Sequence, residues 1–278
     1  MSKKIVILYH GECMDGTGGG WAAWKKFGNK ADYYGLKHGD SLPSGLKGKE
    51  IYVVDFSFKE PLMQKIVREN KKVIALDHHV SAKKSTKMAH EYVYELNKSG
   101  AMIAWQYFHP NKKVPRLTRH IQDLDLWKFK VPGTKELTAY VQMIDLNFKN
   151  FDKIARDLEN SKRRRSYFEK GGLLLRYEKE MIERLLKGAE TVKFAGRKIL
   201  AVNSPVLHSE VGAELVKKKP PIALVWSEKS GALRISLRSN GKVDVSKIAA
   251  RYGGGGHKPA AGFSFPINKP KPWKIIKN

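Results

Sequence analysis

Apolar residues in the first half of the chain come in short runs that alternate with amphipathic stretches. The runs 4–9, 51–54 and 73–76 predict buried strands, and the stretches 21–27, 62–70 and 101–108 predict helices. A repeated order of strand and then helix is typical of a mostly parallel sheet covered by helices. In open sheets of this kind ligands bind beyond the carboxyl ends of the strands, so the residues at those ends indicate what the fold can do.

The pattern changes twice in the second half. Residues 151–190 read as helical and rich in charge, with Gly171-Gly172 followed by an amphipathic stretch. Beyond them, strand-like runs at 198–202, 222–226 and 232–238 and a helix at 209–218 predict a smaller α/β unit. We therefore expect an α/β fold in three parts: an N-terminal domain over 1–150, a helical connector over 151–190 and a C-terminal α/β domain over 191–278.

Acidic and imidazole side chains follow each predicted strand of the first half. The first strand leads into segment 10–16, the second into Asp55 and the third into Asp77-His78-His79, while Asp123-Leu124-Asp125 follows the helix 101–108. One such cluster alone would more often be a turn or a helix start. Because the carboxyl ends of parallel strands share one edge of the sheet, however, these groups are expected to converge. Carboxylates and imidazoles suit manganese or magnesium, so this edge predicts a metal-dependent hydrolase.

These motifs resemble those of the DHH phosphoesterases. Asp77-His78-His79 matches the motif that names the family, Asp55 its second motif, segment 10–16 its first and Asp123 its fourth. Far downstream, residues 253–263 resemble the glycine-rich signature of the DHH-associated C-terminal domain, and Arg238-Ser239 with residues 243–246 fit the segment before it. The resemblance covers nearly the whole chain. Family members include RecJ-type exonucleases, nanoRNases, cyclic-dinucleotide phosphodiesterases and pyrophosphatases.

The resemblance implies a site for one or two ions, usually manganese, with magnesium as the alternative. Asp55 would bridge the ions. The remaining metal ligands would be Asp15, His78 and Asp123 around one ion, with His10 helping to hold the other. His79 would face the substrate phosphate, and Asp77 would orient the site or support a ligand. The C-terminal domain would hold the substrate through Arg238, Ser239, Gly254, Gly255, Gly256 and His257.

The glycines beside His257 have two physical interpretations. Backbone amides of glycine can approach an anion closely, because no Cβ is in the way. The same residues could alternatively serve only a tight turn. Because Arg238 and His257 belong to the same predicted site, we favour the interpretation that these glycines bind phosphate.

Cys13 departs from the family pattern. The first motif usually supplies two aspartates two residues apart, whereas Cys13 stands two residues before Asp15. A thiolate is softer than a carboxylate and favours zinc or iron, although it can still bind manganese. Cys13 is therefore either a metal ligand or a small buried residue near the site, and Glu12 is the other local candidate. The sequence leaves the number of ions open.

Glycines 16 and 18–20 resemble a dinucleotide-binding turn only superficially. Trp21 stands where the last glycine of such a motif belongs, and no lysine-serine pair is present for a phosphate-binding loop of the Walker type. We interpret these small residues as a means to bring a helix N-terminus close to the metal edge, where its dipole favours phosphate.

Charge indicates the class of partner. The chain has 53 Lys and Arg against 27 Asp and Glu, a net charge of +26. Such an excess attracts polyanions, most often nucleic acid, although it can also serve solubility or reflect the host's composition. The run 162–165 is either a basic clamp for nucleic acid or a solvated helix surface. A single cysteine and the absence of a leader or a long apolar run predict a cytoplasmic protein with no membrane partner.

The sequence thus predicts a manganese-dependent phosphodiesterase that cleaves short oligonucleotides of RNA or single-stranded DNA, while the C-terminal domain holds the substrate phosphate. One alternative is a phosphatase of cyclic dinucleotides or of pAp-type nucleotides. Another is a nucleic-acid-binding protein with a degenerate metal site. A homo-oligomer is compatible with all three.

Overall fold

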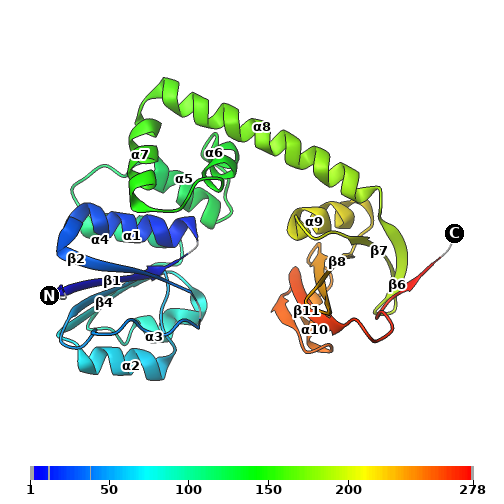
Figure 1. The fold of residues 1–278 in the computed structure, drawn as a ribbon, viewed down its shortest axis with the longest axis horizontal. Helices are drawn as coiled ribbons and strands as arrows, with labels where there is room; N and C mark the ends of the chain where they lie inside the picture. Colours follow the sequence, from blue (N-terminus) through cyan, green and yellow to red (C-terminus); the bar gives the residue numbers. More distant parts are fainter. Residues whose placement is uncertain (1–2, 12, 38, 277–278) are drawn as a thin grey trace. The chain divides into compact units, whose positions relative to one another are not determined.

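The chain forms two compact units, Met1–Leu175 and Arg176–Asn278 (Figure 1). The structure is a computed structural model that describes residues 3–11, 13–37 and 39–276. The boundary between the units falls inside helix α8 (Ser161–Leu186), so this helix belongs to both. Each unit has its own sheet and core, which confirms the expected α/β class with a smaller second domain.

Five parallel strands in the order β2-β1-β3-β4-β5 form the first sheet. The predicted strands are its inner members β1 (Ile5–His10), β3 (Glu50–Val54) and β4 (Lys72–Asp77). The sequence pattern missed the two edges, β2 (Ala31–Leu36) and β5 (Glu91–Tyr94). Because β2 and β3 flank β1 on opposite sides, the connections reverse direction between β1 and β3, and a ligand-binding crevice is expected there.

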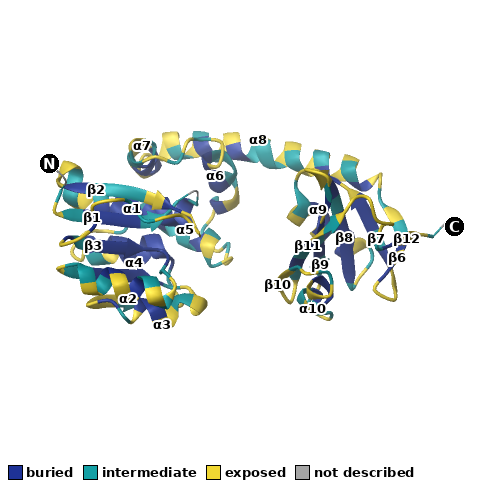
Figure 2. Cartoon of the chain, turned by 60° about the horizontal axis from the view of Figure 1, so that its bottom comes forward, coloured by how far each residue is buried: buried dark blue, intermediate teal, exposed yellow. Residues whose placement is uncertain are grey.

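Helices cover both faces of this sheet. On one face lie α1 (Met14–Phe27) and α4 (Gly100–Phe108), backed by α5 (Arg116–Asp125), α6 (Thr134–Val141) and α7 (Phe148–Glu159). The other face packs against α2 (Glu60–Glu69), and the short elements η1 (Gly28–Lys30), η2 (Val80–Ala82) and α3 (Lys83–Thr86) complete the unit. Alternate residues of β1 enter the two cores, Ile7 on one side and Val6 and Leu8 on the other. Figure 2 shows β3 as mostly buried.

A mixed sheet in the order β10-β11-β9-β8-β7-β6-β12 forms the second unit. Its strands are β6 (Glu190–Phe194), β7 (Arg197–Asn203), β8 (Ile222–Lys229), β9 (Ala232–Ser239), β10 (Gly255–His257), β11 (Ala260–Pro266) and β12 (Lys274–Ile275). Only β7 and β8 pair in parallel among the described strands of this sheet. Helix α9 (His208–Lys218) and the end of α8 pack on one face, and α10 (Val245–Ala250) packs on the other.

The basic run 162–165 lies near the start of α8 and makes contacts within its own unit. Arg163 pairs with Asp157 at 2.9 Å, and Arg165 pairs with Glu169 at 2.8 Å. Arg164 donates a hydrogen bond to a backbone carbonyl near the end of α7. These contacts favour a solvated helix surface over a dedicated clamp. Within the described part of the chain, no helix combines the length and the apolar character needed to span a bilayer.

Candidate metal centre

Side chains that follow three neighbouring strands meet at the carboxyl edge of the first sheet. His10 ends β1, Asp55 comes directly after β3 and Asp77 ends β4. Asp15 and Cys13 arrive from the first turn of α1, where Cys13 is the N-cap residue. The meeting point is therefore the crevice between β1 and β3, as the strand order requires.

Asp55 lies at the middle of this cluster, and only 1% of the residue is exposed. Its Oδ2 atom is 3.6 Å from His10 Nδ1 and 3.7 Å from Cys13 Sγ, while Oδ1 is 3.2 Å from His78 Nε2. The backbone of Asp55 is left-handed, with φ at 64°, a conformation that costs free energy in a residue with a side chain. The N–H of Asp55 donates to the carbonyl of Leu76, which ties the strained residue to β4.

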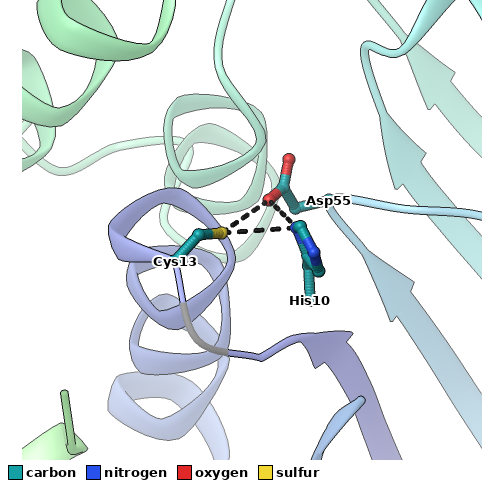
Figure 3. A group of neighbouring side chains, drawn as sticks. All are labelled: His10, Cys13 and Asp55. Carbon is teal, nitrogen blue, oxygen red and sulfur yellow. Dashed lines mark hydrogen bonds and ion pairs between the residues drawn. The ribbon is translucent and has the colours of Figure 1, made fainter. Parts of the chain in front are cut away.

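Two groups of donor atoms lie on either side of Asp55. In the first, which we call the cysteine group, His10, Cys13 and Asp55 point toward one another, and Cys13 Sγ is 3.3 Å from His10 Nδ1 (Figure 3). In the second, the carboxylate group, His78 Nε2 is 3.6 Å from Asp15 Oδ2 and 3.7 Å from an oxygen of Asp125. A third set, Asp55 with His78 and His79, overlaps the carboxylate group at His78, so three sets of three donor atoms come together in the cluster.

Asp15 is held by the N-terminus of α4. Its Oδ2 accepts a hydrogen bond from the N–H of Gly100 at 2.7 Å, and its Oδ1 accepts one from Ala101 at 2.9 Å. Burial raises the pKa of Asp15 well above its usual range, and the charges of Asp55 and Asp125 raise it further. Because buried Asp15 and Asp55 repel each other and the charge of Asp125 adds to this repulsion, a divalent cation between them would be strongly favoured.

Glycines allow these elements to approach one another. A Cβ atom at Gly100 would lie 2.4 Å from Asp55 Oδ1, and one at Gly16 would lie 2.0 Å from the carbonyl oxygen of His10. A Cβ at Gly19 would lie 2.5 Å from a methyl of Val54. This packing confirms the prediction that small residues bring the start of α1 close to the edge of the sheet.

Buried Asp77 orders the turn that carries the two histidines. Its Oδ1 accepts hydrogen bonds from the N–H groups of His78 and His79 at 2.7 and 3.1 Å, and it contacts His79 Nδ1 at 2.8 Å. Its Oδ2 accepts from the hydroxyl of Thr86. The hydrogen bond to Asp77 raises the pKa of His79 and fixes its ring, whose side chain stays 43% exposed. A ring nitrogen of His79 also lies within 4.8 Å of donor atoms of Asp55 and His78.

The structure places Asp125, and not Asp123, beside His78. The carboxylate of Asp123 accepts hydrogen bonds from the N–H groups of Lys130 and Val131 at 2.8 and 3.0 Å and so holds the loop after α5. Burial acts to raise the pKa of Asp123, but these hydrogen bonds lower it overall. Burial raises the pKa of Asp125 instead. Residues two apart on a helix face opposite ways, so only one of this pair can reach the centre, and Asp125 replaces Asp123 as the candidate ligand.

In the cysteine group, the side chains of His10 and Asp55 carry opposite charges. Burial acts to raise the pKa of Asp55, but the neighbouring imidazoles of His10 and His78 lower the value to about 2. Hydrogen bonds with Asp55 and Cys13 raise the pKa of His10 to about 10. His10 and Asp55 therefore form an ion pair at neutral pH, and a cation bound there would displace the proton of His10. Glu12, the other candidate from this segment, lies outside the described residues.

The residues present fit a metal ion. Among the described residues, Asp55 Oδ1 and His78 Nε2 are buried and make no hydrogen bond, although they lie 3.2 Å apart. An unsatisfied buried polar atom costs about 1–3 kcal/mol, so such atoms persist where another partner satisfies them. Carboxylate oxygens with imidazole nitrogens are a donor set that suits manganese or magnesium. The centre therefore has the chemistry to hold one or two divalent cations.

A cavity of about 600 Å³ in the second unit gathers cationic and hydroxyl side chains. Arg238 donates hydrogen bonds to the hydroxyls of Ser209 and Ser236 at 2.7 and 2.9 Å, and Arg234 donates one to Ser264 at 2.8 Å. Of the predicted substrate-binding residues, Arg238 and Gly254 line this cavity. Arg234, Ser209 and His208 line it too and were missed. The alternation of residues 232–238 was a usable signal for Arg234, because residues 234, 236 and 238 share one face of a strand.

The other predicted substrate-binding residues are not among those that line the cavity. The hydroxyl of Ser239 donates to the carbonyl of Val243 at 2.7 Å and accepts from the N–H of Gly241 at 3.1 Å, so it closes a turn. Gly255, Gly256 and His257 form the exposed strand β10. Gly256 has φ at 141°, and a Cβ there would lie 2.6 Å from the carbonyl oxygen of Ala260. The hairpin with β11 therefore requires glycine at position 256, independently of any role in binding.

Comparison with known proteins identifies the family of the chain. The model of the DHHA1 domain matches residues 194–271. Protein R106 of Acanthamoeba polyphaga mimivirus, which is uncharacterized, is 31% identical over 289 residues, covering 94% of this chain and 67% of that protein. The chain belongs to the DHH phosphoesterase family. This DHH phosphoesterase is also 26% identical to oligoribonuclease NrnB of Bacillus subtilis (strain 168) over 294 residues, covering 92% of this chain and 72% of NrnB.

Two solved structures share the fold of this DHH phosphoesterase. The pGpG-specific phosphodiesterase PggH of Vibrio cholerae superposes with a TM-score of 0.58 at 12% identity, over 95% of this chain and 94% of PggH. RecJ of Thermus thermophilus in complex with Mn²⁺ gives a TM-score of 0.53 at 15% identity, over 95% of this chain and 50% of RecJ. At these identities the likeness concerns the fold. Family membership makes the chain a hydrolase of the phosphoesterase class.

Proposed function

We propose that this DHH phosphoesterase is a metal-dependent phosphodiesterase that hydrolyses short oligonucleotides of RNA or single-stranded DNA. Manganese is the proposed cation, with magnesium as the alternative. The observation that carries the proposal is the pair of buried, unsatisfied atoms of Asp55 and His78 among convergent carboxylates. Cations bound in such a centre activate water for attack and neutralise charge on the phosphoryl group.

Each residue of the centre has a proposed role that follows from its position. Asp55 bridges the two donor groups, because one of its oxygens faces each of them. The proposed ligands are Asp15, His78 and Asp125 in the carboxylate group and His10 and Cys13 in the cysteine group. His79 is the group that contacts the substrate phosphate, because its ring is fixed at one nitrogen by Asp77 and remains accessible.

Three features support a short nucleic acid as substrate. The net charge of +26 attracts polyanions. The guanidinium groups of Arg234 and Arg238 in the cavity of the second unit offer charged donors that suit a substrate phosphate. Trp127, two residues beyond Asp125, is 77% exposed and offers a ring on which a base can stack. The names of NrnB, an oligoribonuclease, and PggH, a pGpG-specific phosphodiesterase, point to the same class of substrate.

Hydrolysis of end-labelled di- to pentanucleotides with manganese tests the proposal. The unmodified protein should convert them, and Asp55→Asn and His78→Ala should lower turnover on the order of a thousandfold or more, because each removes a group on which the reaction centre depends. Asp145→Asn, at an exposed position of the same unit, is the matched control and should retain turnover.

The same assay separates the alternatives. Equal turnover in the two variants and the unmodified protein would contradict the assigned site. Binding of oligonucleotides without turnover in the unmodified protein would favour a nucleic-acid-binding protein with a degenerate centre. Faster turnover of pAp, of cyclic dinucleotides or of inorganic polyphosphate would move the substrate from oligonucleotides to those compounds.

A further inference from the structure

The two donor groups on either side of Asp55 differ in chemistry. The carboxylate group adds the oxygens of Asp15 and Asp125 to one imidazole, whereas the cysteine group adds the sulfur of Cys13 to one imidazole. Oxygen donors favour magnesium and manganese, while thiolate donors favour zinc and other softer cations. The two groups therefore have unlike preferences although they are neighbours.

The donor atoms of the cysteine group are spaced as ligands of one small cation would be. The separations are 3.3 Å between Cys13 Sγ and His10 Nδ1, 3.6 Å between His10 Nδ1 and Asp55 Oδ2, and 3.7 Å between Cys13 Sγ and Asp55 Oδ2. Bonds to zinc of about 2.0–2.3 Å at tetrahedral angles place neighbouring donors about 3.4–3.6 Å apart. Figure 3 shows the three side chains, which come from three different elements, directed at one another.

Helix capping does not account for a cysteine at this position. Cys13 Sγ accepts a hydrogen bond from the N–H of Gly16 at 3.2 Å, which is the contact of an N-cap residue. Serine, threonine, aspartate and asparagine are the preferred N-cap residues, and sulfur is a weak acceptor. A residue chosen only to start α1 would therefore carry oxygen.

A second observation in the same centre points to bound cations. Asp55 belongs to the cysteine group, and its other oxygen, Oδ1, makes no hydrogen bond within the described part of the chain. The ring nitrogen Nε2 of His78, which is nine-tenths buried and 3.2 Å away, makes none either. Cys13 is thus next to a carboxylate whose other oxygen already requires a positive partner.

We propose that the cysteine group binds zinc through the thiolate of Cys13, while the carboxylate group binds manganese or magnesium. The centre then holds two unlike metals bridged by Asp55. Zinc binding replaces the S–H bond of Cys13 with a Zn–S bond and the N–H bond at Nδ1 of His10 with a Zn–N bond, and both protons go to solvent. The inference rests on the proposed function only in that both place a cation beside Asp55.

Cobalt(II) substitution reads this ligation directly, because Cys13 is the sole cysteine of the chain. A thiolate bound to cobalt gives a strong sulfur-to-metal charge-transfer band in the near ultraviolet. The full-length protein should show this band and saturate it at one cobalt per chain. Cys13→Ser and Cys13→Asp should lose the band. A cobalt-loaded unmodified protein without the band, or no stoichiometric binding of cobalt, would overturn the proposal.

Metal selectivity gives a second measurement. Competition between zinc and manganese should show that Cys13→Asp lowers the ratio of zinc to manganese affinity by about 10–100-fold, because it replaces the soft donor with a hard one while keeping a ligand. Cys13→Ser is the size-matched comparison. An unchanged ratio in Cys13→Asp would count against the thiolate as a ligand.

Alkylation of the unmodified protein needs no variant and therefore does not depend on how a variant folds. Zinc should slow the reaction of Cys13 with iodoacetamide at least tenfold, and magnesium should leave the rate unchanged. If zinc gives no protection while manganese-driven hydrolysis of oligonucleotides persists, this inference fails and the proposed function stands. If zinc protects Cys13 but no oligonucleotide is cleaved, the proposed function fails and the metal site stands.

Discussion

The metal centre of the first unit and the cavity of the second unit are both polar, but they are built in opposite ways. In the centre, Asp15 and Asp55 are buried and repel each other, polar atoms are left unsatisfied, and Asp55 has a strained backbone. In the cavity Arg238 and Arg234 lie on a regular strand and donate to serine hydroxyls. The first region is organised to receive positive charge, whereas the second supplies it. Substitutions should therefore affect catalysis in the first region and substrate binding in the second.

Substitution of Asp125 should have the largest effect on kcat, and substitution of nearby Asp123 is the comparison. Asp125→Asn should lower kcat on a dinucleotide by about 100–1000-fold, because it removes a proposed ligand, and should not lower Tm, because it relieves repulsion with Asp15 and Asp55. Asp123→Asn should lower the free energy of unfolding by about 1–3 kcal/mol, because Asp123 accepts two backbone hydrogen bonds, with a much smaller change in kcat. Steady-state kinetics and thermal melts of both variants check this. A large loss of kcat in Asp123→Asn, with little loss in Asp125→Asn, would restore Asp123 as the candidate ligand.

Loss of a guanidinium in the cavity should have an intermediate effect of a different kind. Arg238→Ala should raise KM for oligonucleotides by about 10–100-fold and leave kcat nearly unchanged, because a charged hydrogen bond to phosphate is worth about 1.5–3 kcal/mol. Arg197→Ala, at an exposed position of β7 in the same unit, is the charge-matched control and should leave KM within about twofold. If both variants raise KM equally, overall charge and not the cavity holds the substrate.

The smallest effect should come from Ser239. Ser239→Ala should lower the free energy of unfolding by about 1 kcal/mol, because its hydroxyl closes the turn with Val243 and Gly241, and KM should not change. Ser239→Thr, which keeps the hydroxyl, should recover most of the stability. Urea unfolding and KM measured side by side distinguish this from the role in substrate binding that the sequence predicts, which would raise KM at unchanged stability.

In the first unit, the strands that the sequence predicted are those buried on both faces. Continuous apolar runs mark β1, β3 and β4, because neither face of an inner parallel strand meets water. The edges β2 and β5 lack such runs, since β2 includes Asp32 and Gly35 and β5 is only four residues long. An edge strand needs at most one buried face, so its sequence of apolar and polar residues does not differ clearly from that of a loop.

The same distinction applies to the metal centre. The convergence of candidate ligands at strand ends was predictable, because the ends of neighbouring parallel strands must meet. Asp125 was not, because it lies at the end of a helix, where the choice between it and Asp123 depends on how α5 is rotated against the sheet. Apolar periodicity shows that such a helix is amphipathic but does not show which of its polar residues borders a site. The resemblance to the family indicated that an acidic residue of this segment belongs to the site, but it did not indicate which of the two aspartates faces the centre.

Gly100 has no functional group, yet it is as constrained as any ligand of the centre. Its backbone N–H holds Asp15, and the space that a Cβ would fill is taken by the carboxylate of Asp55. Although Gly100 has no side chain that could react, its position would be as intolerant of substitution as the positions of the neighbouring carboxylates. A survey of tolerated substitutions would thus score Gly100 with the reactive residues, although its contribution to the chemistry is the room that it leaves.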